Sequence, residues 1–175
     1  MLTLSVPAGV EHQWFTGSSA PAVLRPAPTS DFTFRARFDS DVRSASGHRL
    51  QGLVLESPDG GFLRFELLGA GARVQASASL VEGGRLTPLG WQRVASEAPW
   101  TLELVRVGAE IECCVLDAEG ARTTVARASF GGEGANHTTV TSPGQRSARI
   151  GVYAGNAFGQ GAPEHTAKVG AIELR

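Results

Sequence analysis

The sequence predicts an all-β domain whose antiparallel strands form a sandwich or a barrel. Apolar and polar residues alternate with a period of two in several short segments, and no stretch of about eleven or more residues shows a persuasive helical period. The 22 glycines and 9 prolines recur in pairs that are typical of turns between short strands. The length of 175 residues, with 42% hydrophobic and 19% charged residues, fits one domain over residues 1–175 with its own core.

The first half of the chain contains three segments with clear alternation. Asp31–Phe38 alternates phenylalanine and alanine with threonine and arginine, so one of its faces is apolar. Gln51–Glu56 and Phe62–Leu67 flank Ser57–Gly61, where proline presets φ and glycine supplies a positive φ. These two segments therefore predict a hairpin, with the leucines of each strand facing the core.

Further strands are predicted in the rest of the chain, with polar segments between them. Gly131–Arg146 is the longest polar stretch, and it is predicted to be a loop, as is Asn156–Pro163. The alternation indicates antiparallel sheets with one face on the core. The predicted strands are Arg73–Leu80, Trp91–Ala95, Trp100–Val107, Ile111–Leu116, Thr123–Phe130, Arg149–Tyr153 and Lys168–Leu174.

Charge and hydropathy exclude some classes of partner. The net charge of −1 gives no electrostatic footprint for nucleic acid or an anionic membrane, and no segment approaches the length of a membrane span. The N-terminus lacks the features of a signal peptide, so we expect a cytoplasmic protein if the chain is full-length and a secreted one if it is excised from a longer protein. Arginine almost replaces lysine, which occurs only at Lys168, and this bias indicates a genome of high G+C content. Selection for arginine's planar fork in binding carboxylates or phosphates is the alternative, which the scattered positions of the arginines do not support.

The two cysteines are neighbours in the sequence. Cys113 and Cys114 lie in a predicted strand, where adjacent side chains point to opposite faces. An ordinary disulfide between them is therefore excluded, and a lone pair of this kind makes a poor metal site. We expect one core cysteine and one on the other face.

Four segments follow one another at intervals that are typical of one group of sandwiches: Asp31–Phe38, Gln51–Phe65, Trp100–Gly108 and Arg149–Gly155. In these segments the chain resembles DUF1349-type, or regulation-of-enolase-like, concanavalin A-like domains, which are similar to the C-terminal sandwich of family 43 glycosidases. The resemblance implies a two-sheet antiparallel jelly-roll sandwich of the lectin and glucanase type, in a carbohydrate-related context. It implies no reaction, because one fold hosts many functions. The chain departs from the pattern after the Trp100 hairpin, where Asp117–Ala121 lacks the family's tryptophan.

One segment looks like the catalytic strand of sandwich glucanases, which carries Glu-x-Asp-x-x-Glu. Glycoside hydrolysis needs two carboxyl groups flanking one bond. Glu110 and Glu112 begin this pattern, but Val115 stands at its third position, so we expect a solvent-facing pair and no catalytic residue. The four histidines show no metal-ligand spacing, and all fall in predicted loops: His12, His48, His137 and His165.

No cofactor is predicted, and calcium is the one metal that the acidic turns could accept. Asp39, Asp41 and Asp59 are oxygen donors of the kind that calcium prefers, but no complete loop signature is present. Asn136–Thr138 fits the pattern of a glycosylation acceptor, which is common by chance.

The remaining chemistry is that of ligand binding. Saccharides are held by flat aromatic rings together with fixed polar groups. Strand parity places Arg64 and Glu66 on the face away from the core, whereas Trp100 shares a face with Leu102 and Leu104 and is predicted to be buried. The candidate binding residues are the aromatic Trp14, Trp91, Tyr153 and Phe158 and the polar Gln51, Arg64, Glu66 and Asn156.

Three functions are consistent with these patterns. The first is a non-catalytic carbohydrate-binding or accessory module that holds an oligosaccharide or glycan across one sheet. The second is a protein-interaction or regulatory domain whose sheet contacts a partner protein. The third, least supported, is a glycoside hydrolase or lyase with carboxylates that the sequence does not reveal.

Overall fold

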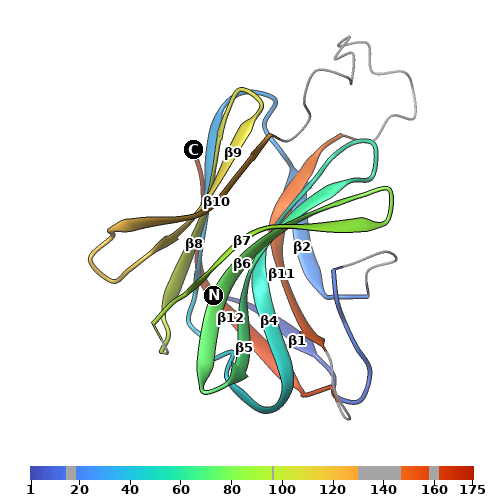
Figure 1. Cartoon of the computed structure of the whole chain (residues 1–175), viewed down its shortest axis with the longest axis vertical. Coiled ribbons are helices and arrows are strands. Elements are labelled where there is room, and N and C mark those ends of the chain that lie inside the picture. Colours follow the sequence, from blue (N-terminus) through green and yellow to red (C-terminus); the bar gives the residue numbers. More distant parts are fainter. Residues whose placement is uncertain (15–18, 96, 130–146, 158–161) are drawn as a thin grey trace.

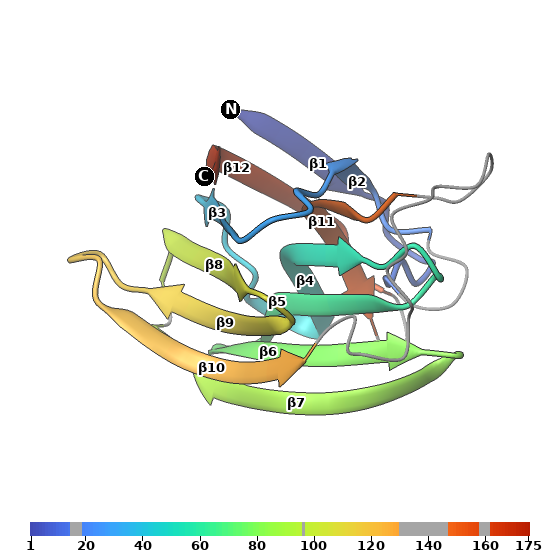
Figure 2. The ribbon, with the colours of Figure 1, turned by 90° about the horizontal axis from the view of Figure 1, so that it is seen from above.

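The computed structural model describes residues 1–14, 19–95, 97–129, 147–157 and 162–175. These residues form twelve strands in two six-stranded sheets, which lie face to face (Figures 1 and 2). All neighbouring strands within each sheet run antiparallel. The described residues contain no helix, so none of them belongs to a helix that could span a membrane.

Each sheet combines strands from distant parts of the chain. The first sheet, called here the β1 sheet, consists in spatial order of β1 (Leu2–Val6), β12 (His165–Leu174), β3 (Phe32–Phe38), β8 (Trp100–Val107), β9 (Glu110–Leu116) and β10 (Arg122–Ser129). The second, the β2 sheet, consists of β2 (Ala22–Pro26), β11 (Arg149–Ala157), β4 (Ser44–Glu56), β5 (Phe62–Gly71), β6 (Arg73–Glu82) and β7 (Arg85–Arg93).

The core lies between the inner faces of the two sheets. Alternate residues of the strands supply it, as the period of two predicts, and Phe34, Phe38, Leu53 and Phe65 are each at most 1% exposed. Burying a side chain of this size removes enough apolar surface to stabilise the fold by about 1.5–3 kcal/mol each. Trp100 is 2% exposed in this core, which confirms the prediction made from its parity.

The predicted fold class, an all-β antiparallel sandwich, is confirmed, and several strand bounds differ from the prediction. The strand β1 was not predicted, β4 begins at Ser44 instead of Gln51, and β7 begins at Arg85 instead of Trp91. These added lengths contain glycine, histidine or exposed residues that interrupt the alternation, but partner strands satisfy their backbone groups. The predicted loop Gly131–Arg146, with its acceptor triplet, lies outside the described residues.

The cysteine pair takes the arrangement expected of strand neighbours. Cys113 points into the core, whereas Cys114 points to the outer face of the β1 sheet, where Nη2 of Arg122 lies 3.2 Å from its Sγ. Both cysteines are free thiols. The predicted absence of a bond between them is confirmed.

A second apolar cluster covers part of the outer face of the β2 sheet. Trp14 and Ala20 pack there against side chains that point away from the core, among them Val54, Phe62 and Tyr153. The chain around Trp14 therefore forms a third layer over β11, β4 and β5. That layer divides the outer face of the β2 sheet into a covered half and an open half.

Candidate functional site

One row of residues crosses the outer face of the β2 sheet from β11 to the edge strand β7. Residues paired across antiparallel strands point to the same face, so their side chains are neighbours. Tyr153, Glu66 and Trp91, all predicted as ligand contacts, belong to this row, whereas Phe158 lies outside the described residues. In order from β11 to β7, the row is Tyr153, Gly52, Glu66, Ser77 and Trp91.

Trp14 closes the half of this face that lies over β11, β4 and β5. Its ring meets that of Phe62 at a right angle with the centroids 6.5 Å apart, and its centroid lies 5.7 Å from that of Tyr153. Edge-to-face contacts of this kind stabilise aromatic pairs. Trp14 is 7% exposed and Tyr153 is fully buried. Both rings therefore pack against the protein and offer no free face to a ligand.

Beneath Trp14 lies a buried polar cluster that joins three strands. The hydroxyl of Tyr153 donates a hydrogen bond to Glu66, and Nε of Arg64 lies 3.3 Å from a carboxylate oxygen of Glu66. Burial raises the pKa of Glu66 above its ordinary value, although Arg64 and the hydroxyl of Tyr153 favour the charged form. Arg64 also donates to Oγ of Ser79 at 3.3 Å and to the carbonyl of Trp14 at 3.4 Å. The cluster thus ties the covering segment to the sheet.

The contact between Tyr153 and Glu66 depends on a glycine. The two residues lie on β11 and β5, with β4 between them, and Gly52 is the residue of β4 that separates them. A Cβ at Gly52 would lie 2.3 Å from the carbonyl oxygen of Phe65 and 2.8 Å from Cβ of Glu66. Glycine therefore leaves the space through which the hydroxyl of Tyr153 reaches Glu66.

The outer face is open around Ser77 on β6 and Trp91 on β7, whereas Val81 of β6 and Leu86 of β7 belong to the covered cluster. Trp91 is 68% exposed, and Ser77 lies opposite it on β6. One step along the strands, Gln75 lies opposite Arg93 on the same face. The side chains of Gln75 and Ser77 are half-buried and make no hydrogen bond to another described residue. This open region presents a flat aromatic ring with uncommitted polar groups beside it.

Two predicted contacts lie elsewhere in the structure. Gln51 points inward and is fully buried, where its amide accepts a hydrogen bond from Oγ of Ser40 at 2.7 Å and donates one to the carbonyl of Ser40 at 3.0 Å. Asn156 is also fully buried, and its amide nitrogen donates to the carbonyls of Pro7 and Pro163. Both side chains fix backbone segments and cannot reach a ligand on the outer face, so neither belongs to the site proposed below.

The chain is similar in fold to several solved structures. No protein-family model and no curated protein matches the chain, so its placement in the DUF1349-type group stays a prediction. The chain is similar to part of a GH43 protein from Bacillus licheniformis, with a TM-score of 0.69 and 15% sequence identity over 88% of this chain. It spans 29% of the length of that GH43 protein. The chain has the concanavalin A-like jelly-roll fold.

Two further structures share this jelly roll over most of their own length. A functionally unknown protein from Saccharomyces cerevisiae has a TM-score of 0.62 and 14% identity, with coverage of 99% of this chain and 86% of that one. The CBM2 module of the evolved Dit protein of Lactobacillus casei BL23 phage J-1 has a TM-score of 0.59 and 11% identity, with coverage of 98% and 78%. Identities this low establish the fold alone.

The carboxylates on the outer face of the β2 sheet are widely spaced. Glu66 faces outward from β5 and Glu56 from β4, where Glu56 pairs with Arg149. Phe62 is the partner of Glu56, so the four-residue step from Phe62 to Glu66 sets their Cα atoms about 13 Å apart along the strands. Glycosidases hold their two carboxyl groups roughly 5–9.5 Å apart. This pair therefore does not resemble a hydrolytic site.

The glutamates of the glucanase-like segment lie on the other sheet. Glu110 accepts a hydrogen bond from Ser129 at the start of β9. Glu112 is held by Thr124 and Arg127, and the hydrogen bond from Thr124, followed by that from Arg127, lowers its pKa. Both carboxylates face outward from the β1 sheet, because Ile111 and Cys113 of the same strand point into the core. Their contacts agree with the expectation of a solvent-facing pair.

Each of the three aspartates considered for calcium contacts residues that are close to it in the sequence. Oδ1 of Asp39 lies 2.8 Å from Nε of Arg37, and Asp41 pairs with Arg43 at 2.6 Å. Asp59 accepts hydrogen bonds within its own turn. In the part of the chain that the structure describes, no three groups of His, Cys, Asp or Glu are placed to hold a metal ion. Calcium binding stays a prediction, and the described residues supply no set of donors for it.

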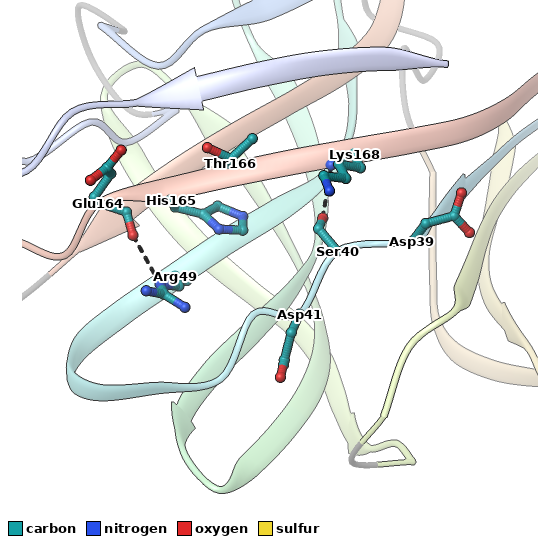
Figure 3. Close-up of a pocket in the computed structure, with 8 residues that line it drawn as sticks. All are labelled: Asp39, Ser40, Asp41, Arg49, Glu164, His165, Thr166 and Lys168. Carbon is teal, nitrogen blue, oxygen red and sulfur yellow. Dashed lines mark hydrogen bonds between the residues drawn. The ribbon is translucent and has the colours of Figure 1, made fainter.

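A polar pocket of about 440 Å³ opens at one end of the sandwich, between β12 and the bend that joins β3 to β4 (Figure 3). Arg49 donates to the carbonyl of Glu164 at 3.0 Å, and the backbone nitrogen of Lys168 donates to Oγ of Ser40 at 2.8 Å. These bonds connect β4, the start of β12 and the bend. The residues that line it are Asp39, Ser40, Asp41, Arg49, Glu164, His165, Thr166 and Lys168.

His165 in this pocket, like His48 within β4, corrects the prediction that all histidines lie in loops. His165 is the first residue of β12, is 3% exposed, and its Nε2 has no hydrogen-bond partner among the described residues. Pairing with Val6 of the unpredicted strand β1 turns it inward. Burial, assisted by Arg49 and opposed by Asp41, lowers the pKa of His165 to about 4.

Acidification from about pH 7 to about pH 5 is expected to cost about 2 kcal/mol of stability through His165. Its pKa falls from 6.5 to about 4 on folding, so the unfolded chain gains its proton first as the pH falls. The contribution is complete above about pH 6.5 and is lost toward about pH 4. Chemical denaturation of wild type and His165→Gln at both pH values measures this contribution, because glutamine does not titrate. An equal loss in both proteins would contradict it.

Sequence reasoning missed the polar neighbours of Trp91. Gln75 and Ser77 belong to the predicted strand Arg73–Leu80, in which alanines alternate with polar residues. That alternation already places the polar positions on the outer face. The position of Ser77 opposite Trp91, and of Gln75 opposite Arg93, depends on the bulge that shifts the register between β6 and β7, which the sequence does not reveal.

Proposed function

We propose that this chain is a non-catalytic carbohydrate-binding module that holds a saccharide against Trp91, on the open outer face of β6 and β7. The observation that carries the proposal is the 68% exposure of Trp91 in a sheet whose other aromatic side chains are covered. Exposing a ring of this size to water is unfavourable, so a ligand that covers it gains free energy. Sugar rings present C–H faces that stack on such a surface.

The surroundings of Trp91 suit a ligand rich in hydroxyl groups. Ser77 and Gln75 supply donors and acceptors beside the ring, and hydroxyl and amide groups fix the orientation of a saccharide. The solved structures support this context, because the GH43 protein and the phage CBM2 module carry the same fold. The alternative of a protein partner stays a prediction, since no feature of the described surface identifies such a partner.

Titration with oligosaccharides tests the proposal directly. Trp14 and Trp100 are 7% and 2% exposed, so the solvent-sensitive part of the tryptophan fluorescence comes from Trp91. We expect at least one member of a panel of neutral and acidic plant, fungal and bacterial oligosaccharides to shift the emission. The same ligand should protect Trp91 from quenching by acrylamide. Unchanged emission and quenching across the whole panel would overturn the proposal.

A further inference from the structure

We propose that the saccharide bound at Trp91 is anionic and carries carboxylate or sulfate groups that Arg73 and Arg93 bind; this inference rests on the proposed function. Arg93 is two residues from Trp91 on β7, so both side chains point to the outer face. Arg73 lies on the same face of β6, because Val74 and Ala76 point into the core and Arg73 has the opposite parity along the strand.

The two arginines are neighbours across the strands. Arg93 is paired with Gln75, and Arg73 lies two positions before Gln75 on the same face. Diagonal neighbours of this kind have Cα atoms roughly 7–8 Å apart, within reach of long side chains. Two guanidinium groups can therefore converge on one anionic group or on successive ones along a chain. Arginine's planar fork suits both carboxylate and sulfate oxygens.

Neither arginine is neutralised by a residue that the structure describes. Arg73 and Arg93 are exposed, and neither makes an ion pair or side-chain hydrogen bond with another described residue. Arg64 shows the contrasting arrangement on the same sheet, since Glu66 lies 3.3 Å from it. The described outward-facing residues of β6 and β7 include no aspartate or glutamate. The open half of the face is consequently cationic, although the whole chain has a net charge of −1.

A polysaccharide matches this arrangement better than a nucleic acid does. A nucleic-acid-binding protein can make about six to ten phosphate contacts, whereas the described residues of this face offer two arginines without an ion pair beside one exposed aromatic ring. A uronic-acid or sulfated oligosaccharide presents a sugar face for Trp91 and widely spaced anionic groups for Arg73 and Arg93. The acidic substituent therefore determines which saccharide is selected, and Trp91 supplies the stacking surface.

Two matched ligand pairs test this inference by isothermal titration calorimetry. One pair is an oligogalacturonate and its full methyl ester, and the other is a sulfated galactan oligosaccharide and its desulfated form. Within each pair the sugar backbone is the same, and the anionic group is either esterified or removed. We expect one anionic member to bind about ten-fold tighter than its neutral partner at low salt, with the difference shrinking at high salt. The pair that shows the difference identifies carboxylate or sulfate as the group recognised.

Variants assign the effect to the two arginines. In Arg73→Gln/Arg93→Gln the ratio of anionic to neutral affinity should fall to about one. Arg25→Gln on β2, at the opposite edge of the sheet, removes one positive charge, as each of these two substitutions does, and it should keep the wild-type ratio.

The outcomes separate this inference from the proposed function. Equal binding of anionic and neutral members would overturn the anionic selectivity and leave the carbohydrate-binding proposal intact. Binding of neither member of either pair, together with silence across the wider panel, would overturn both. Tighter binding of a single-stranded oligonucleotide than of any saccharide would also overturn the inference.

Discussion

Replacing Trp91 with alanine is expected to weaken saccharide binding by about 2–3 kcal/mol, which corresponds to a roughly 30- to 150-fold rise in Kd. The loss follows from removal of the aromatic surface on which the sugar stacks. Trp91 is 68% exposed, so the same substitution should change the free energy of unfolding by only about 0.5 kcal/mol. Calorimetric titration and chemical denaturation of the same preparation measure the two effects.

Trp91→Phe is the matched control for this loss. Phenylalanine keeps a flat ring of smaller area, so its affinity should lie between those of wild type and Trp91→Ala. Retention of wild-type affinity in Trp91→Ala would move the binding site away from β7. Loss of affinity accompanied by a large loss of stability would mean that Trp91 supports the fold and would contradict its role as a platform.

The fold could be predicted from the sequence because strand alternation is a local signal. The segments Phe32–Phe38 and Trp100–Val107 have the predicted bounds or differ by one residue, and both bury the predicted face. The signal fails where pairing alone defines a strand. Leu2–Val6 was not predicted because it is short and terminal, and it is paired to β12 across almost the whole chain.

The candidate site was only partly predictable, because parity gives the face of a residue and not what covers it. Arg64 and Glu66 lie on the outer face as predicted, yet Trp14 and Tyr153 bury Glu66 to 3% exposure. Gln51 could have been excluded by the same rule, since it shares its face with Leu53 and therefore points inward. A polar amide alone is therefore weak evidence for a ligand contact, because it also serves to bind backbone groups in the interior.

On the outer face of the β2 sheet, the buried polar cluster stabilises the strands that carry the open region around Trp91. Glu66 stands between Tyr153 and Ser77 in the row that ends at Trp91. The hydrogen bond from Tyr153 to Glu66 ties β11 to β5, and the hydrogen bond from Arg64 to Ser79 ties β5 to β6. A binding face works best when its neighbours are locked by packing and hydrogen bonds. The buried cluster thus holds in place the strands beside the proposed binding residues, and it does not contact the ligand itself.

Replacing Arg64 with methionine is expected to destabilise the fold by about 3–5 kcal/mol at neutral pH. The side chains of Arg64 and Glu66 are 12% and 3% exposed, so loss of the guanidinium leaves a buried carboxylate without its cation. Burial already raises the pKa of Glu66 above 4.5, and without Arg64 that pKa rises further. Chemical denaturation at neutral pH measures the loss.

The pH dependence and the double variant Arg64→Met/Glu66→Gln distinguish a stranded charge from lost packing. Because the folded pKa of Glu66 is raised, the folded variant keeps a proton that the unfolded chain releases above about pH 4.5, so its stability falls as the pH rises through that window. The double variant has no charge to strand, keeps an acceptor for the hydroxyl of Tyr153, and should recover part of the loss at neutral pH. If the single and double variants are equally destabilised at every pH, the cost comes from packing of the arginine stem and not from the ion pair.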